Sequence, residues 1–230
     1  MESYFQPTAG AKALEQSFFT KVYQRMTLGL VVSAITSFFV LSNPALIKTL
    51  FGTGMGWIPF LVLLGYSFWL SAAAHRLSAQ ALNLAFVGLS ILYGVALTPI
   101  AFGYTGTSIV STFFITSGVF AVFSVYGYTT KKDLTSIGSL AIMGLWGIVL
   151  AILINFFLRS SMMSLVISFI VVALTVIVIA FETQRLKNIY YHATSQNASL
   201  DHVASMGAIS LYGSFILLFV HLLNILGQRR

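Results

Sequence analysis

The sequence lacks cysteine altogether and carries very little charge. Without cysteine there is no disulfide framework, no thiol nucleophile and no thiolate metal site. Only 7% of the 230 residues are charged and 58% are hydrophobic, whereas about a quarter of the residues in a soluble domain are charged. The mean hydropathy of +0.93 is typical of a chain embedded in a lipid bilayer. We predict an all-α integral membrane protein.

The motifs of soluble enzymes are missing as well. The chain has no glycine-rich phosphate loop followed by Lys-Ser/Thr, no His-Glu-x-x-His zinc helix and no Gly-x-Ser-x-Gly nucleophile elbow. The histidines are too dispersed to form a metal cluster by spacing, so any metal stays unknown, and no cofactor is indicated. The net charge of +7 comes from basic residues scattered between apolar runs, which argues against nucleic acid as a partner. We expect a protein that is not an enzyme.

Charged residues separate uncharged runs that are long enough to cross the roughly 30 Å hydrocarbon core of a bilayer. These runs cover residues 26–47, 49–75, 77–130, 134–158, 160–181 and 202–228. The third run is too long for one helix and contains a turn signal at residues 102–107. The pattern therefore predicts seven spans in a single helical domain, residues 21–230. We expect the last of these helices to pack centrally. A polar cytoplasmic tail, residues 1–20, precedes it.

Seven spans place the two termini on opposite sides of the membrane. If the N-terminus is cytoplasmic, the inner segments hold more basic residues than the outer ones, which favours this orientation. The inner set is Lys12, Lys21, Arg25, Arg76, Lys131, Lys132, Arg185 and Lys187, and the outer set is Lys48, Arg159, Arg229 and Arg230. The C-terminal pair opposes the bias, so a last segment that dips in and returns is the competing topology.

One acid, Glu182, stands at the end of an apolar run, since residues 160–181 carry no charge. The other acids, Glu2, Glu15, Asp133 and Asp201, fall in stretches that we interpret as tails or loops. Ionisable groups at membrane depth usually face protein or water and often mark proton or ion paths. Two interpretations stay open. Glu182 is either a solvated acid beside Arg185, or it faces the bundle and meets a basic residue of another helix, for which Arg76 lies on the correct side.

Small and hydroxyl residues recur at helical spacing on three of the predicted spans. They are Ser161, Ser164, Ser168, Thr175 and Glu182 on the sixth span, Gly207, Ser210, Ser214, His221 and Asn224 on the seventh, and Asn83, Ser90, Gly94 and Thr98 on the third. Such stripes let membrane helices approach closely and hydrogen-bond to one another. We interpret each stripe as a packing face. The alternative is a narrow polar path, with Ser168, Thr175, Ser210 and His221 as its candidate residues.

Four segments together resemble the Bax inhibitor-1 (transmembrane Bax inhibitor motif) family. They are Lys21-Val22-Tyr23, residues 126–135 (YGYTTKKDLT), residues 181–184 (FETQ) and the run from Ser210 to Gly227, and the resemblance covers about residues 18–227. It implies an integral membrane protein of six or seven helices, in bacteria in the inner membrane. It also implies a role in membrane homeostasis or stress response, through a pH-sensitive calcium leak or through restraint of a membrane-bound ATP-dependent protease.

The resemblance implies roles for three residues. Leak members of the family carry an aspartate on the sixth helix and another on the seventh, latched by an arginine of the second. Glu182 takes the place of the first aspartate, Arg76 that of the arginine, and Ser214 stands where the second aspartate would be. Two close carboxylates share protons, which a carboxylate beside a serine does not, and calcium prefers several oxygen ligands.

The loss of the second acid favours a regulator over a channel. We predict a membrane regulator in contact with a membrane-bound protease complex, for which the segment 187–202, interpreted as a loop, is the preferred contact. The alternative is a calcium or proton leak gated by Glu182 and Arg76.

Overall fold

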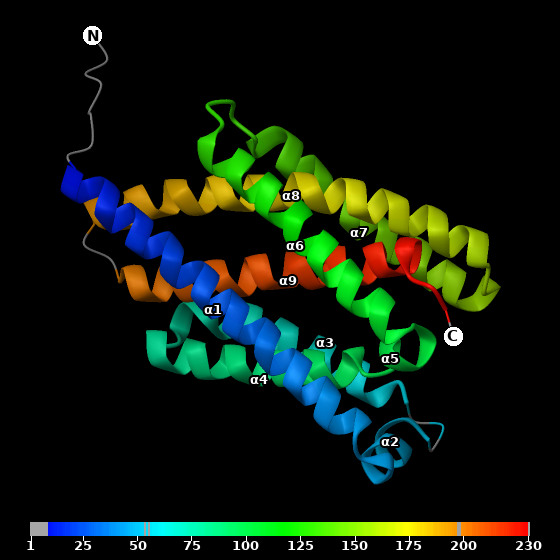
Figure 1. Cartoon of the computed structure of the whole chain (residues 1–230). Helices are drawn as coiled ribbons and strands as arrows, with labels where there is room; N and C mark the ends of the chain where they lie inside the picture. Colours follow the sequence, from blue (N-terminus) through cyan, green and yellow to red (C-terminus); the bar gives the residue numbers. More distant parts are fainter. Residues whose placement is uncertain (1–8, 53, 55, 197–198, 230) are drawn as a thin grey trace.

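The chain folds into a bundle of long helices (Figure 1). The computed structural model describes residues 9–52, 54, 56–196 and 199–229. Its helices are α1 (Ala9–Leu41), α2 (Pro44–Phe51), α3 (Ile58–Ala73), the 3₁₀ turn η1 (Ala74–Arg76), α4 (Ala79–Leu97), α5 (Ile100–Gly103), α6 (Gly106–Thr129), α7 (Thr135–Leu158), α8 (Ser161–Ser195) and α9 (Leu200–Leu226). Within the described ranges, seven of them are long and apolar enough to span a membrane. The predicted all-α fold with seven spans is confirmed.

The first helix begins earlier than predicted. α1 starts at Ala9, so the second part of the predicted tail, residues 1–20, is helical, and residues 1–8 lie outside the described part. Phe18 and Phe19 are only 3% and 7% exposed. The Phe18 ring packs against Tyr190 of α8, with ring centroids 5.0 Å apart. The burial of this pair was not evident from the sequence, because most of the polar residues next to it lie on the exposed side of the same helix.

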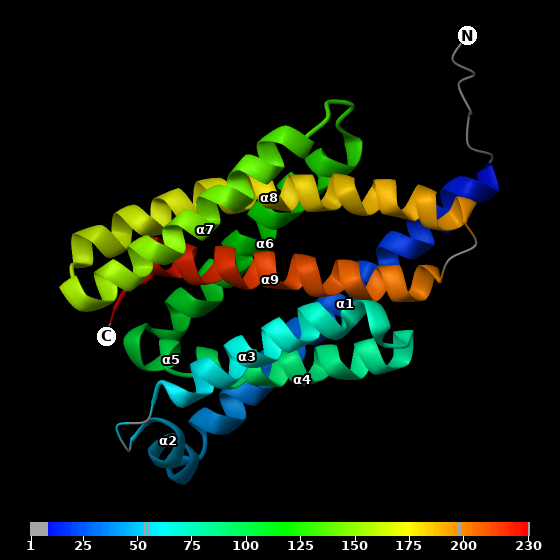
Figure 2. The same ribbon diagram turned by 180° about the vertical axis from the view of Figure 1, so that it is seen from behind.

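The last helix, α9, lies at the centre of the bundle, as predicted. It packs against α8, α1, α6 and α4. In two opposite views it runs between α8 and α4, with α1 and α6 crossing one face (Figures 1 and 2). Tyr212, Leu218 and Leu223 of α9 are completely buried. Because so much of α9 is enclosed, its polar side chains have partners on other helices within reach.

Glycines bring α8 close to its neighbours. A Cβ atom added at Gly127 of α6 would lie 2.1 Å from the carbonyl oxygen of Ala180, and one added at Gly207 of α9 would lie 2.7 Å from a methyl of Leu186. Small residues at membrane-helix contacts allow such backbone approach. The face of α8 that carries Glu182 is thereby held against α9.

α8 is much longer than the membrane is thick. Its 35 residues span about 52 Å at 1.5 Å per residue, against roughly 30 Å of hydrocarbon. The helix continues to Ser195 and α9 begins at Leu200. The interpretation of segment 187–202 as a loop is therefore wrong for most of its length. The helical pattern was obscured there because the residues become polar where the helix passes beyond the apolar run.

Candidate functional site

Glu182 projects from α8 toward α9. It lies about 32 Å along the helix from Ser161, at 1.5 Å per residue, close to the length needed to cross the hydrocarbon core. Its Oε1 accepts a hydrogen bond from Ser210 Oγ at 2.5 Å, and its Oε2 accepts one from Ser214 Oγ at 2.7 Å. The two serines are one turn apart on the same face of α9. Both carboxylate oxygens are therefore held by the neighbouring helix.

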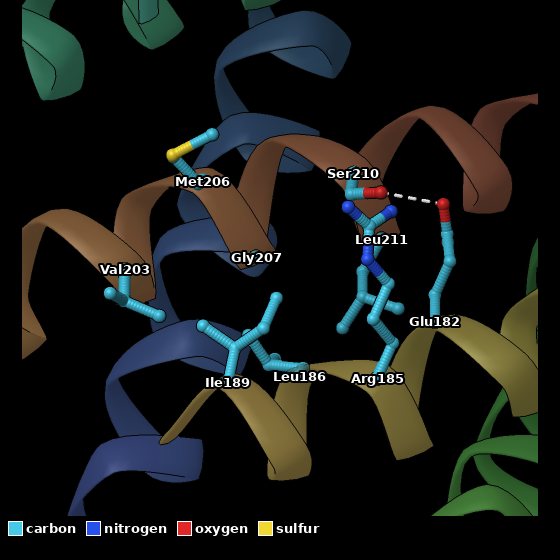
Figure 3. Close-up of a pocket in the computed structure, with 9 residues that line it drawn as sticks. All are labelled: Glu182, Arg185, Leu186, Ile189, Val203, Met206, Gly207, Ser210 and Leu211. Atoms are coloured by element: carbon cyan, nitrogen blue, oxygen red, sulfur yellow. Dashed lines mark hydrogen bonds between the residues drawn. The ribbon is translucent and has the colours of Figure 1, made fainter. Parts of the chain in front are cut away.

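A cavity of about 170 Å³ lies beside this contact, between α8 and α9 (Figure 3). It is lined by Glu182, Arg185, Leu186, Ile189, Val203, Met206, Gly207, Ser210 and Leu211. Arg185 extends from α8 toward α9 across the same space (Figure 3). Among the ion pairs of the described residues there is none between Glu182 and Arg185. The cavity thus presents a carboxylate and a guanidinium, of which the carboxylate is bound by hydroxyls.

Arg76 is not brought to Glu182. It ends η1, where its side chain is exposed, and the described part of the chain contains no ion pair between the two residues. α3 and η1 belong to the side of the bundle that packs on α4, whereas α8 packs on α9, α7 and α6. The expected pairing of Glu182 with Arg76 is therefore not found in the described structure. Two residues at the same end of the bundle meet only if their helices pack against each other, and these do not. Ser214, the other matched position, does contact Glu182 directly through its hydroxyl, and its role in a latch stays a prediction.

The predicted polar stripe divides into two clusters. Ser210 belongs to the Glu182 cluster, whereas Ser168 Oγ and His221 Nδ1 meet at 2.9 Å further along the α8–α9 contact. Asn224 Nδ2 donates to the same Ser168 oxygen at 2.8 Å. Thr175 lies between the clusters on α8. It is completely buried, and no described residue bonds its Oγ1. In the described ranges no three His, Cys, Asp or Glu side chains come close enough to hold a metal ion.

Two further acids, which we interpreted as tail or loop residues, join helices at the end of the bundle where α8 stops. Glu15 is 5% exposed, and its Oε2 accepts a hydrogen bond from Tyr191 of α8 at 2.8 Å. Asp201 of α9 pairs with Arg25 of α1 at 2.5 Å. Spacing could not reveal these contacts, since each partner is more than a hundred residues away in the sequence. For Glu15 there was one local signal, an acid shortly before the buried Phe18, and for Asp201 there was none.

The fold and the site define a polytopic helical membrane protein in which one carboxylate joins the sixth span to the central seventh. Residues 15–230 match the family described as "Inhibitor of apoptosis-promoting Bax1". The chain belongs to this family, the Bax inhibitor-1 family, as its motifs indicated.

Bacterial relatives share most of the chain's length. The inner membrane protein YbhL of Escherichia coli (strain K12) is 38% identical over 231 residues, covering 100% of this chain and 97% of the relative. A protein of Borreliella burgdorferi is 36% identical over 218 residues, covering 94% of each chain. One of Caulobacter vibrioides is 34% identical over 224 residues, covering 94% of this chain and 90% of the relative. The full-length likeness to YbhL, with seven apolar helices, supports an integral inner-membrane location.

Proposed function

We propose that this protein is a non-enzymatic regulator of membrane homeostasis in the bacterial inner membrane, acting through contact with a membrane-bound ATP-dependent protease. The observation that supports it most is the use of both Glu182 oxygens as acceptors for α9 hydroxyls. Hydrogen bonds to a charged acceptor contribute about 1.5–3 kcal/mol each, more than neutral ones. The carboxylate therefore acts as a link that fixes α8 against the central helix. A partner protein would recognise the position of α8 that this link sets.

The surface for the partner is the end of α8 beyond Glu182. Its last thirteen residues extend about 20 Å past the carboxylate at 1.5 Å per residue. This segment is stiffened by the Tyr191–Glu15 hydrogen bond and by Lys187, whose Nζ donates to the carbonyl of Tyr128 at 3.0 Å. Ile189 and the Tyr191 ring are partly exposed there. The excess of Lys and Arg at this end supports a cytoplasmic N-terminus, which places the segment on the cytoplasmic side.

The proposal is tested by protein turnover in bacterial membranes. Affinity purification of the tagged full chain is expected to recover the protease, and deletion of the gene is expected to change the half-lives of its membrane substrates. Glu182→Gln, which keeps the shape of the side chain but not its charge, should reproduce part of the deletion effect. Asp133→Asn removes one negative charge from the exposed α6–α7 loop and serves as the matched control. Unchanged substrate half-lives after deletion would contradict the regulator.

A calcium or proton leak is the second candidate, and the polar row between α8 and α9 is what favours it. Glu182 lines a cavity at one end of the row, His221 lines another further along, and the buried Thr175 hydroxyl lies between them. Purified protein in liposomes should then give a pH-dependent calcium or proton flux that Glu182→Gln abolishes. A flux equal to that of protein-free liposomes would rule the leak out. The two functions are separable, because the regulator needs no flux.

A further inference from the structure

A second cavity, of about 410 Å³, lies at the opposite end of the α8–α9 contact. It is bordered by α5, α7, α8 and α9, and its polar lining residues are Tyr104, Asn155, Ser164, Ser168, His221 and Asn224. The C-terminal segment is fixed beside it, because the backbone N–H of Thr105 donates to the carbonyl of Gln228 at 3.1 Å. This segment carries Arg229 to Asn224, where Nη2 donates to Oδ1 at 3.0 Å. None of these residues contacts Glu182 in the described part of the chain.

The hydrogen bonds of this cluster can be followed from Arg229 to His221. Arg229 can only donate, so the Asn224 atom that faces it is the oxygen and Nδ2 faces α8. Asn224 Nδ2 then donates to Ser168 Oγ at 2.8 Å. Ser168 Oγ accepts from Asn224, so its own hydrogen is available to His221 Nδ1, 2.9 Å away, when the ring carries its hydrogen on Nε2. We assign His221 this neutral tautomer, because it gives the Ser168 hydrogen an acceptor. The chain of bonds that begins at Arg229 ends in an N–H donor on the cavity wall.

Asn155 supplies a second donor to the same cavity. Its Oδ1 accepts from the backbone N–H of Ser160 at 3.1 Å, which assigns the amide orientation because a backbone N–H can only donate. The Nδ2 group of the Asn155 amide takes no part in this bond. Neither this Nδ2 nor His221 Nε2 has a hydrogen-bond partner within the residues that the structure describes. Two directed donors thus line one cavity without an acceptor.

The charges at this end of the bundle point the same way. Of the described acids, Glu15, Asp133 and Asp201 lie at the other end, on the first turns of α1, in the α6–α7 loop and at the start of α9. Glu182 is about 21 Å from Ser168 along α8, at 1.5 Å per residue. Lys48, Arg159 and Arg229 lie at the cavity end, with no acid among the described residues there to neutralise them. Donors and positive charge, with no acid among the described residues at this end, match an oxyanion.

We propose that this cavity binds an oxyanion, a phosphate group, through His221 Nε2–H and the Asn155 amide, with Arg229 at its rim. The phosphate group comes either from the head of an anionic phospholipid or from a soluble phosphate. Ser168 and Asn224 are positioning residues, since they hold the His221 ring and set its tautomer. The site is independent of the regulator, because it uses neither Glu182 nor the end of α8, whereas it shares His221 and its cavity with the polar row considered for the leak.

The test is binding of inorganic phosphate to the purified full chain in neutral detergent. Phosphate should raise the unfolding temperature of the wild type and saturate. Asn155→Asp keeps the oxygen that bonds Ser160 but replaces the donor with a carboxylate, so it should weaken binding at least about tenfold, the factor that 1.4 kcal/mol represents. Lys48→Gln changes the net charge by the same single unit at the same end of the bundle, outside the cavity lining. It should change binding less than about twofold.

A second experiment, which measures lipid binding, identifies the source of the phosphate group. After exchange with vesicles of equal phosphatidylglycerol and phosphatidylcholine, native mass spectrometry should find phosphatidylglycerol retained by the wild type and not by Asn155→Asp. Retention of this lipid with no response to inorganic phosphate assigns a headgroup, and the reverse assigns a soluble anion. Either supports the site. Absence of both responses in the wild type overturns it.

Equal losses in Asn155→Asp and Lys48→Gln would also overturn the proposal, because they would show a diffuse charge effect. His221→Leu is the second variant in case Asn155→Asp does not fold, as judged by a monodisperse size-exclusion peak. It removes the imidazole and with it the Nε2–H donor, so it should weaken phosphate and lipid binding in the same sense. Wild-type binding by a folded His221→Leu would contradict the site.

Discussion

The two polar clusters on the α8–α9 contact are opposites in their hydrogen bonding. At Glu182 both side-chain oxygens accept hydrogen bonds from hydroxyls of α9, so they are bonded within the protein. At His221 a line of donors starts at a guanidinium and ends at a ring N–H that has no acceptor within the described part of the chain. The same pair of helices therefore carries a closed cluster, suited to holding the helices together, and an open one, suited to binding a ligand. The closed cluster is built around the acid Glu182, which accepts hydrogen bonds, whereas the open one begins at Arg229, which can only donate them.

The largest effect is expected when the closed cluster is broken. Glu182→Ala removes two charge-assisted hydrogen bonds between α8 and α9, each worth about 1.5–3 kcal/mol. The serines regain part of this by bonding carbonyls of their own helix, so we expect a loss of roughly 3 kcal/mol. The measurement is the free energy of unfolding in micelles. A change below that of His221→Leu would contradict the closed cluster.

The two serines of the closed cluster should differ. Ser214 is 8% exposed, whereas Ser210 lines the cavity beside Glu182 and is exposed. Ser214→Ala should therefore cost about 2 kcal/mol and Ser210→Ala about half as much, because water or headgroups can replace an exposed donor. Unfolding of the two single variants and of the double variant measures this difference. The opposite order would show that Ser210 is the main partner.

In the open cluster the loss of a bond should cost less. His221→Leu removes one bond between neutral groups, the contact with Ser168, which is typically worth about 1 kcal/mol. Its effect on stability should be smaller than that of Ser214→Ala, while its effect on phosphate binding should be larger. Unfolding and binding measured on the same preparations separate the two roles. A cost equal to that of Glu182→Ala would make the His221 cluster a structural link instead.

The smallest effect is expected between the clusters. Thr175 is completely buried, and its Oγ1 is without a partner in the described structure. Thr175→Val keeps the shape and removes an unbonded hydroxyl, so stability should be unchanged or higher by up to about 1 kcal/mol. A clear loss of stability would show instead that this hydroxyl holds an internal water, which would favour the leak. The control is Thr112→Val on α6, which is equally buried.

Much of the site followed from spacing on single helices. Glu182, Ser210 and Ser214 belong to stripes that the sequence places on one side of their helices, and the family match put Ser214 opposite Glu182. Arg76 could not be assigned in the same way. Its position depends on the packing of η1 and α3 against α4, which no pattern within the second span records. The roles of Glu15 and Asp201 were missed for a related reason, because their partners Tyr191 and Arg25 are distant in the sequence.

The sequence alone determined the class of the protein, the seven spans and the family. These follow from local quantities, namely the length of apolar runs and the identity of short motifs, because the bilayer imposes the same length on every span. Only the tertiary structure decided which polar groups meet. A helix repeat says which side of a helix a residue occupies, but contact also needs the rotation and depth of the neighbouring helix. Those are fixed by close approaches such as that of Gly127 to Ala180, far apart in the sequence.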